Sequence, residues 1–385
     1  MKRISLIAIM ALMGIGSVAA KSSTTLPIVG EVVKATNPLI QYVGRVSFAK
    51  NETASFNFPG TSIFARFQGS SLKMICRPMT GYFMAQVDGC EPFKVGFNAE
   101  RDSVVTVAAA LPKGEHQVKL MYVIEGLFRT PEFRGFVLDK GCSLVKSPDL
   151  PERKIEFIGN SITCGYGVES IEMTDPFEDE TENHWLTYAN IVSDSLNAQH
   201  TSISRSGIGV YRNYDGPKAG SDENMPWQYE YTLFNKHDEK WDFNKYQPQL
   251  VCINLGTNDL STNNYDIAHY EKNYRMFLTT VRSKYPNAKI VLITGPMLGE
   301  KESGEQREVL DRICSDANKK GFTLPEEVRK ARKGKNKGDK DIYRFDFTFQ
   351  AGDLGYGASW HPSKLQHQKM AGELLPFLRN LMGWE

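Results

Sequence analysis

Short stretches of alternating apolar and polar residues fill the chain between residues 40 and 145. Ser62–Phe67 and Phe83–Val87 are clear examples, and a period of two is typical of strands that bury one face. Turn-forming pairs separate these stretches: Pro59-Gly60, Gly69-Ser70, Asp88-Gly89 and Lys113-Gly114. Strands that follow one another at about ten-residue spacing favour a β-sandwich or jelly roll. No helical period stands out there, so we predict an all-β N-terminal domain.

The pattern changes at Pro148–Pro151, which we interpret as the junction between two domains. Beyond it, apolar runs predicted as strands alternate with helical patterns, such as His184–Leu196, whose apolar residues return to one face. The predicted strands are 154–158, 250–255, 289–294 and 340–347, and the predicted helices are 184–196, 265–285 and 362–381. This order predicts an α/β domain, with a flavodoxin-like parallel sheet between two layers of helices.

The first twenty residues differ from the rest of the chain. Lys2 and Arg3 precede an apolar run, Ile4–Ile15, and small residues, Val18 and Ala20, stand where a signal peptidase reads. We predict a cleavable signal over 1–20 and therefore a secreted protein, periplasmic or extracellular. The alternative is a retained anchor, which the short apolar run disfavours. The remaining chain divides into a β-sandwich domain at 21–148 and an α/β domain at 149–385.

The charge balance of the chain argues against a polyanionic partner. The chain has 46 Lys+Arg and 45 Asp+Glu, and removal of Lys2 and Arg3 with the signal leaves 44 against 45, a net charge of −1. This balance gives no reason to expect a nucleic-acid or other polyanionic partner. A basic run at 329–340 fits a solvated loop, with a polyanion-binding patch as the alternative; no aromatic residue interrupts it.

The cysteine spacing gives no sign of a metal site. The six cysteines are Cys76, Cys90, Cys142, Cys164, Cys252 and Cys314, and none forms a CxxC pair, so we predict no zinc. Cys164 and Cys252 lie in sequence contexts typical of buried thiols. Export permits disulfides, and Cys76–Cys90 is the candidate pair, with free thiols as the alternative.

The first of three polar motifs directly follows the predicted strand 154–158. It reads Gly159-Asn160-Ser161-Ile162-Thr163. Active sites of parallel sheets lie at the carboxyl ends of the strands. A serine at such a turn has an exposed hydroxyl and a free amide, as a nucleophile needs. The alternative is a serine that only caps a helix.

The other two motifs offer a hydrogen-bond donor and a base. Leu255-Gly256-Thr257-Asn258-Asp259 ends the strand 250–255, and the Asn258 carboxamide can stabilise an oxyanion at the same sheet edge. The alternative is a polar turn. Ser359-Trp360-His361-Pro362 precedes the last predicted helix, where Pro362 suits a helix start. His361 is therefore expected in a loop and not on a packed helix face.

Together these motifs resemble the GDSL-type (SGNH) esterases, which are defined by Ser, Gly, Asn and His blocks. The Ser206-Gly207-Ile208-Gly209 stretch is similar to their glycine block, and the other three motifs are similar to the Ser, Asn and His blocks. The resemblance is closer still to family 2 of the carbohydrate esterases, which joins an N-terminal β-sandwich to such a domain. Its landmarks are similar to Tyr42–Val46, Phe58–Ser62 and Phe157–Gly167. The resemblance covers nearly the whole mature chain and implies hydrolysis of acetyl esters on xylan, mannan or related plant polysaccharides.

The resemblance also implies a role for individual residues. Ser161 is the expected nucleophile and His361 the base that takes its proton. The amides of Ser161 and Gly207 and the side chain of Asn258 are the expected oxyanion hole, with Gly209 as the alternative glycine. Trp360 is expected to stack on a sugar ring, with a core tryptophan as the alternative. No metal or cofactor is implied.

The sequence departs from the GDSL pattern at two places. Asn160 replaces the usual Asp of the GDS block, which is not the nucleophile, so the chemistry should survive. Ala358 and Ser359 stand where an Asp usually precedes the His. We therefore predict a Ser–His dyad, in which a main-chain carbonyl, Ser359 or a more distant acid such as Asp353 orients the imidazole. A triad loses most of its activity when its orienting acid is removed, so a dyad needs another acceptor.

Two other functions remain open on the sequence alone. One is a GDSL-type esterase or lipase with a different acyl or sugar preference. The other is a glycan-binding protein whose esterase site has decayed, which the absent Asp motivates. Five other histidines receive no role: His116, His200, His237, His269 and His367. We expect an acetylated oligo- or polysaccharide as partner and a monomer or weak oligomer without a membrane span.

Overall fold

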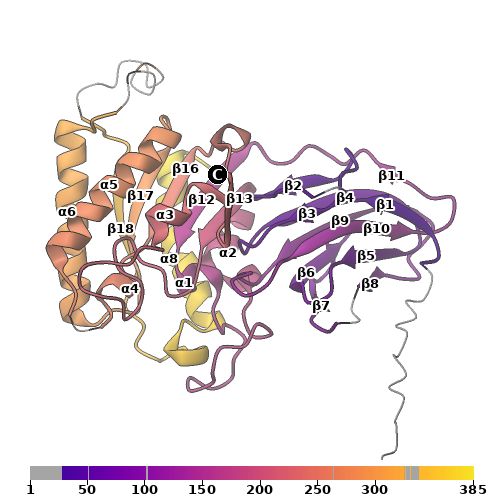
Figure 1. Cartoon of the computed structure of the whole chain (residues 1–385), viewed down its shortest axis with the longest axis horizontal. Helices are drawn as coiled ribbons and strands as arrows, with labels where there is room; N and C mark the ends of the chain where they lie inside the picture. The colour runs from indigo at the N-terminus through magenta and orange to yellow at the C-terminus, as the bar shows by residue number, and fades with distance from the viewer. Residues whose placement is uncertain are drawn as a thin grey trace, which may run out of the picture.

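The computed structural model describes residues 28–385 except 51, 101–102, 263, 325, 327–329 and 331–337. The predicted signal at 1–20 and most of the basic run at 329–340 therefore lie outside the described residues. The described chain forms a β lobe from its N-terminal third and an α/β lobe from the rest, side by side in Figure 1. In the described residues, no helix is long and apolar enough to cross a membrane.

The β lobe consists of two antiparallel sheets. One has the order β1-β10-β5-β8 with β3 paired to β10, and the other has the order β11-β4-β9-β6-β7 with β2 paired to β4. The strands are Glu31–Lys34 (β1), Gln41–Val43 (β2), Ala54–Ser55 (β3), Ser62–Gly69 (β4), Leu72–Cys76 (β5), Gly81–Val87 (β6), Phe93–Phe97 (β7), Val104–Ala108 (β8), Gly114–Tyr122 (β9), Glu132–Leu138 (β10) and Leu144–Val145 (β11). The predicted sandwich is confirmed, and its two clearest strands coincide with β4 and β6.

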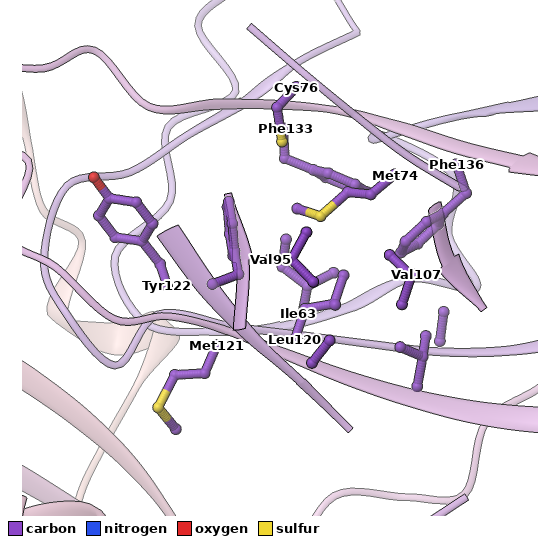
Figure 2. Packing of buried hydrophobic residues seen from close by; sticks show 14 of the residues in the cluster. Ile63, Met74, Cys76, Val95, Val107, Leu120, Met121, Tyr122, Phe133 and Phe136 are labelled. Atoms are coloured by element: carbon purple, nitrogen blue, oxygen red, sulfur yellow. The ribbon is translucent and has the colours of Figure 1, made fainter. Parts of the chain in front are cut away.

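Side chains from both sheets fill the space between them (Figure 2). Met74 of β5 and Phe136 of β10 come from one sheet, and Ile63 of β4 and Leu120 of β9 come from the other; all four are fully buried. Alternate residues of a strand point to opposite faces, so the alternating sequence pattern places these apolar side chains on the two inner faces.

The candidate disulfide does not form. Cys76 is buried at the end of β5, whereas Cys90 is exposed in the turn after β6, and both are free thiols. The alternative of free thiols therefore holds for this pair, because the two side chains lie in opposite environments, core and solvent. The prediction that Cys164 and Cys252 are buried thiols is confirmed.

The α/β lobe is built on a parallel sheet of order β13-β12-β16-β17-β18. Its strands are Arg153–Gly159 (β12), Ala198–Ser204 (β13), Leu250–Asn254 (β16), Lys289–Thr294 (β17) and Ile342–Asp346 (β18). The helices are Ser161–Cys164 (α1), Tyr188–Ser195 (α2), Met225–Gln228 (α3), Thr257–Leu260 (α4), Ile267–Lys284 (α5), Glu300–Lys320 (α6) and Lys364–Met382 (α8), with 3-10 turns His184–Leu186 (η1), Phe243–Lys245 (η2) and Ala358–Trp360 (η3). A small hairpin, Tyr231–Leu233 (β14) and Lys236–Lys240 (β15), lies outside the sheet.

Helices cover both faces of this sheet, as predicted. Ile290 and Leu292 of β17 belong to the core cluster with α5 and α6, while Val291 and Ile293 belong to the cluster with α2 and α8. Strand β17 is therefore apolar on both faces, which explains its continuous apolar run in the sequence. The doubly covered sheet leaves its carboxyl edge as the place where polar side chains can gather.

The predicted helix 184–196 is divided in two. Thr187 has an extended backbone and caps α2, so η1 and α2 are separate elements. A capping threonine satisfies amide donors at a helix start and so ends the preceding turn. Ser363 caps α8 in the same way, which leaves His361 in the loop before that helix, as expected.

Buried polar contacts join the two lobes. Arg45 of the β lobe is 1 % exposed and donates from Nη1 to the main-chain oxygens of Tyr229 and Tyr231, at 2.5 and 2.7 Å. Its guanidinium also lies 5.0–5.7 Å from four aromatic ring centroids, those of Phe58, Tyr229, Trp241 and Phe243. A desolvated arginine among aromatic rings and carbonyls fixes the two lobes against each other.

Candidate active site

Ser161 lies at the start of α1, immediately beyond the carboxyl end of β12. The close turn from strand to helix depends on Gly159, because a Cβ at that position would lie 2.1 Å from Oγ1 of Thr163. Asn160 caps α1, accepting a hydrogen bond from the Ile162 amide at 3.1 Å. The cap is therefore Asn160, which leaves the Ser161 hydroxyl available for another partner.

That partner is His361. Nε2 of His361 lies 2.8 Å from Oγ of Ser161, although the two residues are 200 positions apart in sequence. Nδ1 of the same ring lies 3.0 Å from the Ala358 carbonyl and 3.2 Å from the Ser359 carbonyl. Carbonyl oxygens only accept, so Nδ1 carries the proton and Nε2 is left as the acceptor for the serine hydroxyl.

Main-chain carbonyls thus occupy the position at which the sequence lacks an acid. The Ser359 side chain instead points to the Asp175 carbonyl at 3.5 Å. Asp353 is exposed and is not among the hydrogen-bond partners of His361 in the described chain. Three acceptors for Nδ1–H of His361 were considered from the sequence, and the one found in the structure is the main-chain carbonyl.

An unusual turn aims these carbonyls. Ser359 and Trp360 both have left-handed backbones, with φ of 50° and 58°. Each such residue costs about 1–2 kcal/mol, so the turn needs external support. The Trp360 amide donates to the Met173 carbonyl at 3.2 Å, and the Gln350 side chain donates to the Trp360 carbonyl at 2.8 Å. The surrounding loops therefore hold a strained segment whose effect is to orient His361.

Aromatic side chains shield the imidazole from water. The Tyr166 ring stacks on His361, with centroids 4.1 Å apart and an interplanar angle of 25°, and Phe177 lies behind it at 4.6 Å. Desolvation lowers the pKa of His361 to about 4, although the two carbonyls at Nδ1 favour the charged form. The imidazole is therefore neutral, and able to accept a proton, at every pH well above 4.

Gly207 and Asn258 lie near the same sheet edge, in the segments that follow β13 and β16. Gly207 has φ of +74°, and its amide has no hydrogen-bond partner within the described ranges. The Gly209 amide, in contrast, donates to Oδ1 of Asn213 at 3.1 Å. Asn258 Nδ2 donates one hydrogen to the Ile208 carbonyl at 2.8 Å, which leaves its second hydrogen available.

Asp259 anchors the loop that carries Gly207. Its buried carboxylate accepts hydrogen bonds from the amides of Val210, Tyr211 and Arg212, at 2.8–3.1 Å. Burial raises the pKa of Asp259 to about 6. No role was predicted for Asp259 from the Gly256–Asp259 motif, since a carboxylate that binds amides leaves no trace in sequence spacing.

Trp360 lies at the rim of the site and is 52 % exposed, so the alternative of a core tryptophan is wrong. A cavity of about 660 Å³ lies beside Phe177 and reaches the β lobe. Phe128, 93 % exposed, is part of its wall. Both lobes therefore line this cavity, but neither Ser161 nor His361 lies in its wall.

Several other histidines, among them His184, His200 and His367, lie in the interior. His367 is 1 % exposed and stacks on Tyr188. His184 and His200 face each other, with their Nε2 atoms 3.0 Å apart, and burial lowers the pKa of both. Across the described residues, no group of three or more His, Cys, Asp or Glu side chains could hold a metal ion.

Comparison with known proteins assigns a family to each part of the chain. Residues 155–374 match the family of GDSL-like lipases and acylhydrolases, which places the α/β lobe in that class of ester hydrolases. Residues 42–148 match the N-terminal domain of carbohydrate esterase family 2.

Similar proteins agree with both matches. A solved family 2 carbohydrate esterase from Clostridium thermocellum, in complex with cellohexaose, is 34% identical with a TM-score of 0.79, covering 90% of this chain and 100% of that one. An acetylxylan esterase / glucomannan deacetylase of Cellvibrio japonicus is 27% identical over 358 residues, 91% of each chain. The cellulase/esterase CelE of Acetivibrio thermocellus is 34% identical over 351 residues, 90% of this chain but only 40% of that protein.

The chain belongs to carbohydrate esterase family 2 and is classed with the carboxylic ester hydrolases. The predicted family is thereby confirmed. The two-lobe architecture agrees with the solved relatives along almost their whole length.

Proposed function

We propose that the protein removes acetyl groups from plant polysaccharides such as xylan or mannan through an acyl-serine intermediate. The observation that carries this proposal is the 2.8 Å contact between Oγ of Ser161 and the unprotonated Nε2 of His361. A hydroxyl next to a neutral imidazole, with Nδ1 bound to carbonyls, is the arrangement that nucleophilic catalysis requires.

In this mechanism, Oγ of Ser161 attacks the acetyl carbonyl carbon while Nε2 of His361 takes the hydroxyl proton. The tetrahedral intermediate collapses, and the imidazolium returns that proton to the leaving sugar oxygen. Water then attacks the acetyl-serine with the same histidine as base, and acetate and free Ser161 are formed. The Ala358 and Ser359 carbonyls stabilise the imidazolium through Nδ1–H, in place of an aspartate.

The oxyanion hole consists of the Ser161 and Gly207 amides and the Asn258 side chain. The unpartnered Gly207 amide supports this choice, and the bound Gly209 amide argues against the alternative glycine. Each preorganised donor of this kind contributes about 3 kcal/mol to transition-state stabilisation.

Polysaccharide as substrate is supported by the exposed Trp360, whose flat ring can stack on a pyranose. The Cellvibrio relative is an acetylxylan esterase / glucomannan deacetylase, and the Clostridium relative was solved in complex with cellohexaose. Such polymers lie outside the cell, which agrees with the secretory signal proposed over 1–20. For the mature protein, we propose a division into two domains, residues 21–148 and residues 149–385.

The test is acetate release from acetylated xylan and from 4-nitrophenyl acetate. Ser161→Ala should lower kcat by at least about 10⁴-fold, whereas Ser193→Ala should leave it unchanged. Ser193 is a matched control because it is also buried and its hydroxyl bonds only to the Ala189 carbonyl of its own helix. Wild-type rates in Ser161→Ala would refute the proposed nucleophile.

Two further outcomes address the alternatives. A series of 4-nitrophenyl esters should show the highest kcat/KM for acetate, and a preference for long chains would refute the acetyl specificity. Glycan binding without any detectable turnover would identify a decayed site instead.

A further inference from the structure

A glutamate of the β lobe contacts the loop of the α/β lobe that carries Gly207. Glu125 lies three residues beyond the end of β9, and its Oε2 accepts a hydrogen bond from the Ser206 amide at 2.6 Å. Glu125 is 5 % exposed. A carboxylate is rarely buried unless hydrogen bonds compensate for its lost hydration. The burial of Glu125 against the 206–207 loop therefore requires an explanation.

The contact lies one peptide unit before the proposed oxyanion donor. On the other side of Gly207, its own carbonyl accepts from the Tyr214 amide at 2.8 Å, and the Ile208 carbonyl accepts from Asn258. Gly207 has positive φ and no side chain to pack, so its own backbone preference is weak. The direction of the Gly207 amide is therefore set by the groups that hold its neighbours.

Glu125 is itself held in place by both lobes. Its amide donates to Oε2 of Glu182 at 2.8 Å, and the next amide, that of Gly126, donates to the Asn57 carbonyl at 2.9 Å. Glu182 is fully buried, and burial raises the pKa of both carboxyl groups. Burial is the main cause at both groups, and at Glu125 the charge of Arg205 partly offsets it.

We propose that Glu125 is a positioning residue through which the β lobe fixes the oxyanion hole of the α/β lobe. It fixes the Ser206 peptide, and thereby the direction in which the following Gly207 amide points. The β lobe then helps to position a catalytic hydrogen-bond donor of the α/β lobe, in addition to packing beside the site. This inference rests on the proposed function, because it takes Gly207 as an oxyanion donor.

The experiment compares three substitutions of Glu125 by their kcat and KM for 4-nitrophenyl acetate. Glu125→Ala removes the acceptor and should lower kcat by about tenfold to hundredfold with little change in KM, because a displaced donor matters mainly in the transition state. Glu125→Gln keeps an oxygen acceptor and should stay within about threefold of wild type. Glu125→Asp draws the acceptor back by one methylene and should fall between them.

The control separates positioning from interface stability. Ser47→Ala breaks another contact between the lobes, the hydrogen bond from Ser47 Oγ to the Glu239 carboxylate, without touching residues 125–126 or 206–207. It should lower the melting temperature but keep kcat. An equal loss of kcat in Ser47→Ala and Glu125→Ala would overturn the inference, since any weakened interface would then have the same effect.

Other results are also decisive. Unchanged kcat in Glu125→Ala would overturn the inference, as would a full loss in Glu125→Gln. Should Glu125→Ala fail to fold, Glu125→Asp decides: a wild-type kcat there overturns the inference, and a lowered kcat with unchanged KM supports it. Ser161→Ala, measured alongside, distinguishes failure of the proposed function from failure of this inference alone.

Discussion

Replacing Tyr166 with alanine should raise the pKa of His361 and move the acid limb of the pH–rate profile upward. The tyrosine ring covers one face of the imidazole, with centroids 4.1 Å apart. Desolvation is the main cause that lowers the pKa of His361 from 6.5 to about 4. Removing the ring admits water to that face, which favours the imidazolium.

The size of the effect follows from the pKa difference. A shift from 6.5 to about 4 corresponds to about 3 kcal/mol between the two protonation states. At pH 5, a histidine of ordinary pKa is about 3 % neutral, whereas one with a pKa of 4 is about 90 % neutral. Catalysis needs the neutral form, so activity is present above the folded-state pKa and is lost as the pH falls through it. Because Tyr166 covers one of two faces, we expect an upward shift of about one unit.

The assay is kcat/KM for acetate release between about pH 3.5 and 8, which reports ionisations of the free enzyme. Asp259, whose pKa is about 6, titrates within the same range, so the measured quantity is the shift between variant and wild type. Tyr166→Phe keeps the stacked ring and should retain the wild-type acid limb. Coincident acid limbs in Tyr166→Ala and wild type would refute the reasoning, as would a wild-type His361 pKa near 6.5 measured by NMR.

Three further variants test other contacts. Asp259→Asn weakens the anchor of the 210–212 amides and should lower kcat about tenfold at constant KM; steady-state kinetics with an unchanged kcat would contradict it. Trp360→Ala should raise KM for acetylated xylo-oligosaccharides severalfold but not for 4-nitrophenyl acetate, and equal changes for both substrates would argue against sugar stacking. Arg45→Ala leaves buried carbonyls without a donor and should lower the free energy of unfolding by about 3 kcal/mol; a loss under about 1 kcal/mol in urea denaturation would be inconsistent with this.

Where the hydrophobic pattern was clearest, the predicted helices and strands agree with the structure. The predicted strand 289–294 coincides with β17, and the predicted helix 265–285 differs from α5 by two residues at its start and one at its end. Helix α6 and strand β13 were not predicted. The buried face of α6 includes Ser303 and Gln306 beside Val309, Leu310 and Ile313, so its apolar period is incomplete. The Gln306 side chain is buried because it donates to the Leu255 carbonyl, a partner that only the fold supplies.

Periodicity and short motifs are local properties, so they were enough to predict the two kinds of domain and the residue types at the carboxyl edge of the sheet. The sequence by itself could not decide what orients His361. Every residue has a carbonyl, so the acceptors at Ala358 and Ser359 have no side-chain signature, and their direction depends on two left-handed residues that distant loops hold in place. The contact of Glu125 could not be predicted from the sequence either, because Glu125 contacts Ser206 only when the two lobes pack together.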